Sequence, residues 1–480
     1  MQHGYDRPGP DGRVRRRAPA APWRGRLALA ALAAAAITGS GARAQEAEAG
    51  RGAARLRAAA GMQEADTLRL GLDEAVRRAT TTNEQVLIAR ARQAQAAGLV
   101  KEVRADALPQ IDATFGYTRN IQKPVLFFNS PQGVQQITIG NDNEYTIGLS
   151  LSQTLFDFSL GPARAAARMS REATGDLIEA ARTNVALSAR TTYYDVLLSS
   201  SLVDVQRKAL EQARRRLAQV QDFYDAGTAS EFDLLTAQVE VDNLRPPLIG
   251  ARNQLALNLN RLKRTVGIPL DRPIALTDSF PAPADTAASL DTYLAMAEEG
   301  RSDLRAEKIR VDLQGENLIS KKRSALPTLS FTAGVQRRAS SGDLLPPEQD
   351  FTQSATAGLA FSVPLFDGRK RSGQVQQAAA EKESARFQLQ QLRQDIRLQV
   401  QQAYQDLQAA RQRIEASQAN VQRAERALQI AETRFRNGLS TQVELNDAEL
   451  AVTQARTNHA QALHDYGVAR ANLMASVGQR

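Results

Sequence analysis

The stretch RFRNGLSTQVELNDAEL, residues 434–450, is a polar, helix-favouring sequence that a single glycine, Gly438, interrupts. A similar stretch, FYDAGTASEFDLLTAQV at residues 223–239, has Gly227 in the corresponding place. Glycine readily adopts the left-handed conformation that ends a helix, and Ser, Thr or Asn can cap the helix that follows. Each stretch is therefore predicted to be the tip of a helical hairpin.

The two stretches belong to an internal duplication. The register that aligns Gly227 with Gly438 also aligns Leu234/Leu445, Ala237/Ala448, Val241/Val452, Arg245/Arg456 and Ala251/Ala462. Upstream, the motif ALP occurs at residues 107–109 and 325–327, and LFD occurs at 155–157 and 365–367. Landmarks that recur in one order indicate two copies of one unit. We predict a first repeat at 67–268, a proline-rich linker at 269–288 and a second repeat at 289–480.

Each repeat is predicted to contain a helix, two strands, a long helix and a further helix, in that order. The helical segments are expected at 70–105, 160–225 and 229–265, and again at 291–323, 369–437 and 441–477. From Val400 to Phe435 the apolar and small residues alternate three and four apart, the period of a left-handed coiled coil. A helix over 369–437 would be about 100 Å long, which predicts a rod. Pro246 and Pro247 fall inside the 229–265 helix, where a bend or break is expected.

The strands are predicted at 111–119, 144–153, 329–337 and 355–364, and each alternates apolar with small or polar residues. In a soluble sheet this pattern marks a half-buried strand, but no other sheet-forming partner is evident here. The pattern and length are also typical of tilted transmembrane strands. Four strands cannot close a barrel, and an open edge in lipid leaves backbone groups unpaired. The barrel is therefore predicted to be shared between copies of the chain, with eight strands from two copies or twelve from three.

The junctions between helices and strands carry recurring residues. Pro109 and Pro327 are expected to end the helices that lead into strands, because proline disfavours a helical residue before it. Asp157 and Asp367 stand where strands return to helices and are placed to cap free N–H groups. We interpret all four residues as structural.

The first 44 residues are predicted to be a secretory signal peptide, with a linker at 45–66. A basic start is followed by the apolar run LALAALAAAAITG and a small-residue cleavage motif, ARA, before Gln45. Its removal takes away eight Arg and two Asp, so the net charge of +9 falls by six to +3. The high charge therefore gives little support to nucleic-acid binding.

Nothing in the sequence points to catalysis, a metal or a cofactor. The chain has no cysteine, and it carries no nucleophile elbow, P-loop or dinucleotide motif. His459 and His464 are five residues apart and do not share a helix face. We expect a protein that is not an enzyme.

The ALP and LFD motifs, together with RFRNGLST and the following VELNDAELAVTQARTNHAQALHDY, resemble the TolC family of outer-membrane efflux and secretion channels. The match runs from LGLDEAV near residue 70 to VGQ at 477–479. The resemblance implies an α+β membrane protein: a homotrimeric twelve-stranded β-barrel, four strands per chain, that continues into a coiled-coil helical tunnel across the periplasm. It also implies two partners, a periplasmic adaptor (membrane fusion) protein and an inner-membrane pump of RND, ABC or MFS type, with no nucleic acid.

On this resemblance the hairpin tips form the closed aperture and the adaptor-docking surface of a passive exit duct. The tip residues are Ala226, Gly227, Thr228, Asn437, Gly438, Leu439 and Ser440. Nearby charges are predicted to form salt bridges, between chains or within one chain, that hold the aperture shut: Asp222, Asp225, Glu432, Arg434 and Arg436. Two alternatives are a soluble periplasmic coiled-coil adaptor or scaffold and a filament-forming protein, but both leave the alternating strands unexplained. The sequence does not specify the cargo.

Overall fold

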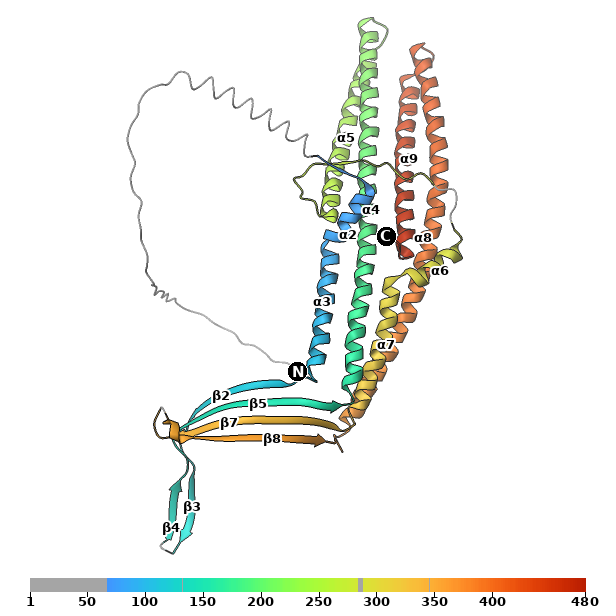
Figure 1. Cartoon of the computed structure of the whole chain (residues 1–480). Helices are drawn as coiled ribbons and strands as arrows, with labels where there is room; N and C mark the ends of the chain where they lie inside the picture. The colour runs from blue at the N-terminus through green and yellow to red at the C-terminus, as the bar shows by residue number, and fades with distance from the viewer. Residues whose placement is uncertain (1–66, 132, 284–287, 345) are drawn as a thin grey trace, which may run out of the picture. The chain divides into compact units, whose positions relative to one another are not determined.

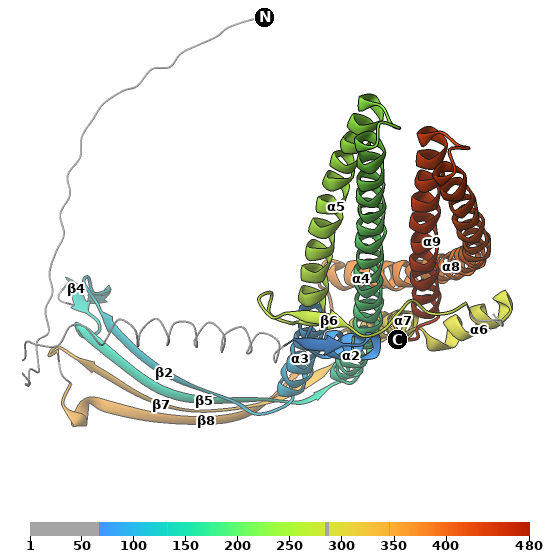
Figure 2. The same ribbon diagram turned by 90° about the horizontal axis from the view of Figure 1, so that it is seen from above.

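The computed structural model describes residues 67–480 apart from 132, 284–287 and 345. The predicted signal peptide at 1–44 and the linker at 45–66 lie outside the described residues. Long helices pack side by side, and a four-stranded sheet extends from one end of them (Figures 1 and 2). The helices are α2 (Leu72–Thr82), α3 (Glu84–Ala105), α4 (Leu160–Asp225), α5 (Glu231–Val266), α6 (Leu290–Gly300), α7 (Ser302–Arg323), α8 (Lys370–Arg436) and α9 (Gln442–Ser476).

The long helices form two antiparallel hairpins, α4 with α5 and α8 with α9 (Figure 1). Helix α4 has 66 residues and α8 has 67, so each is about 100 Å long at 1.5 Å per residue. Leu210, Ala213 and Val241 are buried between α4 and α5. Leu428 and Val452 are buried between α8 and α9. Apolar seams on otherwise polar helices thus produce the rods that the coiled-coil spacing predicts.

The two helices predicted at 70–105 and 291–323 are each interrupted, which the sequence analysis missed. Asn83 separates α2 from α3 with an extended backbone, and its side chain accepts a hydrogen bond from Gln85 N (3.0 Å). Asn side chains compete in this way with the helical backbone pattern. In the second repeat Arg301 has an extended backbone between α6 and α7, and its guanidinium donates to the Asp303 carboxylate (2.6 Å). Tertiary contacts from Arg301 to Gln399 of α8 (2.8 Å) hold this break in place.

A bend or break was expected at Pro246 and Pro247, and the break is not found, because α5 is continuous from Glu231 to Val266. The two prolines remove the N–H groups that would bond the carbonyls of Asp242 and Asn243. Both prolines and both of these residues are exposed in the chain. Solvent can therefore satisfy the freed carbonyls, and the helix passes through the prolines.

The sheet contains the four predicted strands in the order β2 (Gln110–Arg119), β5 (Asn143–Asp157), β7 (Thr328–Ser341) and β8 (Phe351–Ser362), all antiparallel. Strands β5 and β7 are longer than predicted, and β8 begins and ends earlier. The register pairs Ile111 with Leu151, and Phe115 with Ile147, which keeps the apolar residues on one face. Strands β2 and β8 are the outer strands, and neither has a second neighbouring strand in the described part of the chain.

Five smaller elements were not predicted. Strands β3 (Val125–Ser130) and β4 (Gly133–Thr138) form a hairpin between β2 and β5, and a 3₁₀ helix, η1 (Glu348–Asp350), precedes β8. Strand β1 (Leu68–Leu70) pairs in parallel with β6 (Ile274–Leu276), which lies in the predicted linker at 269–288. The buried Tyr193 hydroxyl donates to Leu70 O (3.1 Å) and accepts from Asp278 N (3.2 Å). These bonds fix both strands against α4.

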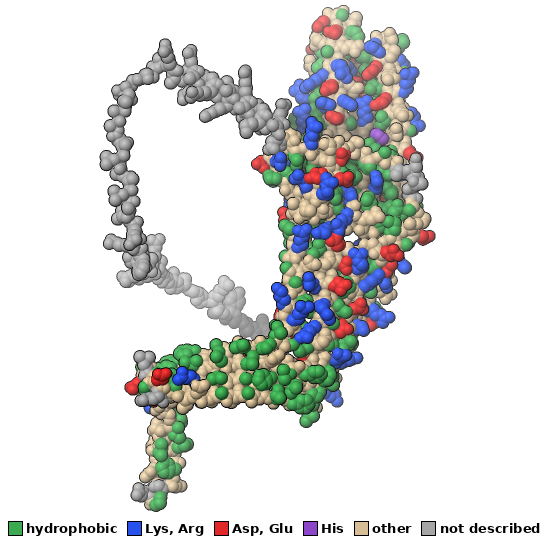
Figure 3. Space-filling view, in the orientation of Figure 1, with side chains coloured by type: hydrophobic (Ala, Val, Ile, Leu, Met, Phe, Trp, Pro, Cys, Tyr) green, Lys and Arg blue, Asp and Glu red, His purple; other side chains and the backbone are tan. Residues whose placement is uncertain are grey.

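The surface of the chain divides into two chemical regions. Hydrophobic side chains gather over the sheet, whereas Lys, Arg, Asp and Glu cover the helices (Figure 3). Phe115 and Phe361 on the sheet are 72% and 70% exposed, respectively. A large exposed apolar face needs an apolar environment or a partner.

Among the described residues, no helix combines the length and the apolar character needed to span a membrane.

Candidate functional site: the ends of the two helical hairpins

The two hairpin tips have the same backbone geometry, as the repeated glycines predict. Gly227 has φ +73° and Gly438 has φ +70°, both in the left-handed region. After each glycine the next N–H turns back to the helix: Thr228 N donates to Phe223 O and Leu439 N to Arg434 O, both at 2.8 Å. This pattern satisfies carbonyls at a helix end and reverses the chain.

Each tip also has a cap for the following helix. Ser230 Oγ accepts from Asp233 N (3.2 Å), and the Asp233 carboxylate accepts from Ser230 N (3.0 Å), which is a capping box. In the second hairpin Thr441 Oγ1 accepts from Glu444 N (3.2 Å). The glycine ends one helix and the capping residue starts the next, so each tip is a short turn with a fixed backbone conformation.

The two tips lie next to one another and share a cavity of about 360 Å³. It is lined from the first hairpin by Val220, Phe223, Thr228, Ala229 and Asp233, and from the second by Phe435, Arg436, Gly438, Ser440 and Gln442. Thr228, Gly438 and Ser440 were predicted tip residues. The structure thus brings the two distant sequence stretches into one surface.

For four of the five predicted aperture charges, the described hydrogen bonds and ion pairs stay within one hairpin and do not reach the other. Asp225 accepts from Gln221 Nε2 (3.0 Å) within α4. Arg434 donates to Leu439 O (3.1 Å) and forms an ion pair with Glu444 (3.9 Å) across its own turn. Arg436 donates to the backbone carbonyl of Glu432 (3.4 Å). For Asp222, the described contact is its carbonyl accepting from Ala226 N (3.1 Å).

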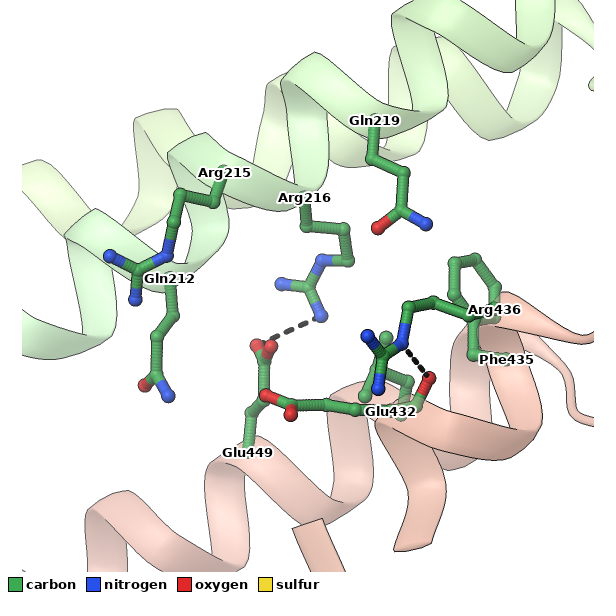
Figure 4. Close-up of a pocket in the computed structure, with 9 residues that line it drawn as sticks. Gln212, Arg215, Arg216, Gln219, Glu432, Phe435, Arg436 and Glu449 are labelled. Carbon is green, nitrogen blue, oxygen red and sulfur yellow. Dashed lines mark hydrogen bonds and ion pairs between the residues drawn. The ribbon is translucent and has the colours of Figure 1, made fainter. Parts of the chain in front are cut away.

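The charged link between the hairpins is formed instead by Arg216 of α4. Its guanidinium reaches Glu240 of α5 at 2.6 Å and Glu449 of α9 at 2.8 Å. It also donates to Asn446 Oδ1 of α9 at 2.5 Å. Arg216 is 4% exposed, and Figure 4 shows it pointing from α4 toward Glu449, with Glu432 beside them. The fifth predicted charge, Glu432, and Arg436 both line a cavity of about 200 Å³ at this cluster.

The electrostatic balance of this cluster depends on Arg216. Burial raises the pKa of the Glu449 carboxyl, Arg216 lowers it, and the neighbouring charges of Glu240 and Glu432 raise it again. The net shift is upward. One buried cation thus holds together carboxylates that would otherwise repel one another.

Sequence reasoning missed Arg216, although the sequence carries a signal for it. The buried positions Ala209, Ala213, Arg216 and Val220 of α4 are four, three and four residues apart. Arg216 therefore occupies a seam position of the coiled coil, where an apolar residue is expected. A charge at a seam position needs a partner, but the pattern does not say which helix supplies it.

A second polar link joins the hairpins farther from the tips. The Nε2 atom of His464 on α9 lies 3.0 Å from Asp195 Oδ1 on α4, and its Nδ1 lies 3.2 Å from Asp465 Oδ1. Burial lowers the pKa of His464, but the two carboxylates outweigh it and the net pKa is raised. His459 instead contacts Ser417 (3.0 Å). The described residues contain no group of His, Cys, Asp and Glu that could hold a metal ion.

The four junction residues lie where they were predicted. Pro109 precedes β2 and Pro327 precedes β7, each a few residues after a helix ends. Asp367 Oδ2 accepts from Arg371 N (3.1 Å) in the first turn of α8. Asp157 accepts from Ser159 N (2.7 Å), one residue before α4 begins, so it orders the approach to the helix rather than its first turn.

The class of protein follows from the fold together with comparisons to known proteins. The family model of the outer membrane efflux protein matches residues 75–268 and 293–479, so the chain belongs to the outer membrane efflux protein family. The two matched segments correspond to the two repeats. The resemblance inferred from the sequence motifs is thereby confirmed.

Individual relatives agree with this assignment. The chain is 23% identical to the outer membrane protein TolC of Escherichia coli K12 over 390 residues, 79% of this chain and 76% of TolC. It is 22% identical to the alkaline protease secretion protein AprF of Pseudomonas aeruginosa over 333 residues, 69% of either chain. The solved CmeC outer membrane channel of Campylobacter jejuni has the same fold, with TM-score 0.70, 19% identity and 85% coverage of each chain. The protein is an exit duct of the outer membrane that extends into the periplasm, and not a soluble adaptor.

Proposed function

We propose that three copies of the chain close one twelve-stranded barrel in the outer membrane, and that their helices form a tunnel into the periplasm. The observation that carries this proposal is the four-stranded sheet, with an apolar face and the outer strands β2 and β8 free to pair. Unpaired backbone groups cost several kcal/mol each in lipid. Pairing β8 of one copy with β2 of the next removes every open edge. The trimer is preferred over a dimer on the analogy with TolC-like channels.

The oligomer can be tested on protein extracted from membranes. We expect a closed trimer in detergent by native mass spectrometry, and discrete conductance steps in planar bilayers. Phe361→Pro in β8 should weaken assembly, because proline has no backbone N–H to donate. Phe361→Ala is the matched control. A stable monomer that conducts, or a dimer, would refute the proposed stoichiometry.

We propose further that the duct is passive, with no catalytic step, and opens at its periplasmic tips. Substrate would be delivered by an inner-membrane transporter through a periplasmic adaptor that docks on the tips. The paired geometry of the tips at Gly227 and Gly438 supports a defined docking surface. The link from Arg216 to Glu240 and Glu449 supports a closed resting position, because it ties the two hairpins of one chain together.

Docking at the tips can be tested with unique cysteines, because the chain has none of its own. Leu439 at the tip is 68% exposed, and Leu398 on α8, far from the tip, is 65% exposed. Leu439→Cys should crosslink to the adaptor in intact cells, and Leu398→Cys should serve as the equally exposed control. Crosslinking at Leu398 alone would place the adaptor elsewhere on the helices.

A further inference from the structure

A cationic cavity lies at the other end of the helices, where α3 leads into the sheet and α4 leaves it. Its volume is about 580 Å³. It is lined by Val100, Arg104, Leu108, Gly161, Arg164 and Arg168. Arg104 is in the last turn of α3, and Arg164 and Arg168 are in the first turns of α4. The cavity plays no part in the contacts between the hairpins described above.

The three arginines of this cavity carry uncompensated charge. Within the described part of the chain none of them has a side-chain hydrogen bond or an ion pair, and Arg164 Nε is shielded from solvent without a partner. Elsewhere on α4, Arg182 and Arg207 each pair with an acid one turn away. Arg164 and Arg168 are four residues apart on one helix face, where like charges repel. A bound anion would remove both the repulsion and the unpaired buried donor.

The position of the cavity identifies the source of that anion. Leu108 is two residues before β2 begins, and Gly161 is four residues after β5 ends. Phe156 and Phe158 at this end of β5 are partly exposed and contact edge to face, with ring centroids 4.5 Å apart. Exposed aromatic residues at the end of a membrane-spanning segment mark the level of the lipid head groups. Basic side chains over the adjoining part of α3 and α4 lie on the same face as the hydrophobic side chains of the sheet (Figure 3).

We propose that Arg104, Arg164 and Arg168 bind the phosphate of an anionic glycerophospholipid in the periplasmic leaflet of the outer membrane. The planar guanidinium donates two parallel hydrogen bonds to phosphate oxygens. Val100 and Leu108 give the cavity an apolar wall. The glycerol and first acyl carbons of a lipid can cover this wall, whereas free phosphate would leave it exposed. The inference rests on the membrane-inserted sheet of the proposed function. The lipid would fix the height of the helix–strand junction in the membrane.

The test uses the full-length processed protein, purified in detergent and stripped of lipid. Native mass spectrometry would count bound dioleoyl phosphatidylglycerol, with dioleoyl phosphatidylcholine and inorganic phosphate as comparison probes. We expect phosphatidylglycerol to bind more tightly than either. Each arginine near a lipid head group contributes about five-fold in affinity, so Arg164→Gln/Arg168→Gln should weaken phosphatidylglycerol binding by about 25-fold. Arg92→Gln is the matched control, because Arg92 is an exposed arginine of α3 outside the cavity.

Each outcome of this test decides the proposal. Equal binding of phosphatidylglycerol and phosphatidylcholine, or equal loss in Arg92→Gln, would overturn it. Inorganic phosphate binding as tightly as phosphatidylglycerol would identify a phosphate site instead of a lipid site. No binding of phosphatidylglycerol to the wild-type oligomer would overturn the proposal as well. Bilayer conductance of the same samples distinguishes a failure of the lipid site from a failure of the proposed function. A protein that does not insert into the membrane would give no conductance, but the detergent binding assay would not detect that failure.

Discussion

Replacement of Arg216 by methionine should loosen the contact between the two hairpins of one chain. The side chain of Arg216 is 4% exposed, and those of Glu240 and Glu449 are 24% and 14% exposed. Removing one partner of a buried ion pair typically costs about 3–5 kcal/mol, because the remaining charge stays buried and unpaired. Here two carboxylates remain, with Glu432 beside them. We therefore expect a loss near 3 kcal/mol, since partial solvent access relieves some of the repulsion.

The assay is amide hydrogen exchange in the tip halves of α4 and α9, together with single-channel conductance. A loss of 3 kcal/mol in local opening free energy corresponds to about 100-fold faster exchange there. Conductance at neutral pH should rise, because the hairpins can separate. Arg207→Met is the control on the same helix, because its pair with Asp204 lies on an exposed surface and contributes little.

The pH dependence separates this explanation from a general loss of packing. The pKa of Glu449 is already raised by burial and by Glu240 and Glu432, and the loss of Arg216 raises it further. Protonation below that pKa removes the repulsion, so the defect of Arg216→Met should shrink as the pH falls through the raised pKa of Glu449. The triple variant Arg216→Met/Glu240→Gln/Glu449→Gln should approach wild-type exchange at all pH values. Wild-type exchange and conductance in Arg216→Met at neutral pH would refute the reasoning.

Three further predictions concern other parts of the chain. The pKa of His464 is raised in the folded state, so its link to Asp195 stabilises that state fully below the unfolded pKa of about 6.5, and this stabilisation is lost as the pH rises through the folded pKa. In thermal melts, His464→Gln should not show this loss of stability with rising pH. The same pH profile in the wild type and in His464→Gln would contradict the assignment. Gly438→Ala should destabilise its tip by about 1–2 kcal/mol through strain alone, because no other residue that the structure describes lies within 4 Å of the new methyl group, whereas Gly250→Ala in α5 should stabilise. Local hydrogen exchange distinguishes the two signs. Tyr193→Phe should cost about 1–3 kcal/mol, because Asp278 N loses its acceptor and Leu70 O keeps only the bond from Thr277 N (3.2 Å), and unchanged exchange in β1 and β6 would show that the hydroxyl contributes nothing.

The sequence by itself determined the features that depend on neighbouring residues. A left-handed glycine followed by a capping residue specifies a helix reversal, so both tips were located to within a residue or two at Gly227 and Gly438. A two-residue period specifies which face of a strand is apolar, and the pairing of Ile111 with Leu151 preserves that face. The three- and four-residue spacing from Val400 to Phe435 specifies a long helix with one buried seam. These signals are local, and they survive without knowledge of the partner.

Only the tertiary structure decided which residues meet across the chain. Arg216 could be identified as a charge at a seam position, but Glu240 and Glu449 come from two other helices, and their approach depends on how the hairpins pack. The helix break at Arg301 depends on a bond to Gln399, which is distant in sequence, and Asn83, besides its local bond to Gln85, donates to the distant Thr265 O (3.1 Å). The continuity of α5 through Pro246 depends on that side of the helix being exposed. Helix and strand propensities act within a few residues, whereas ion pairing and burial depend on the environment that the whole fold provides.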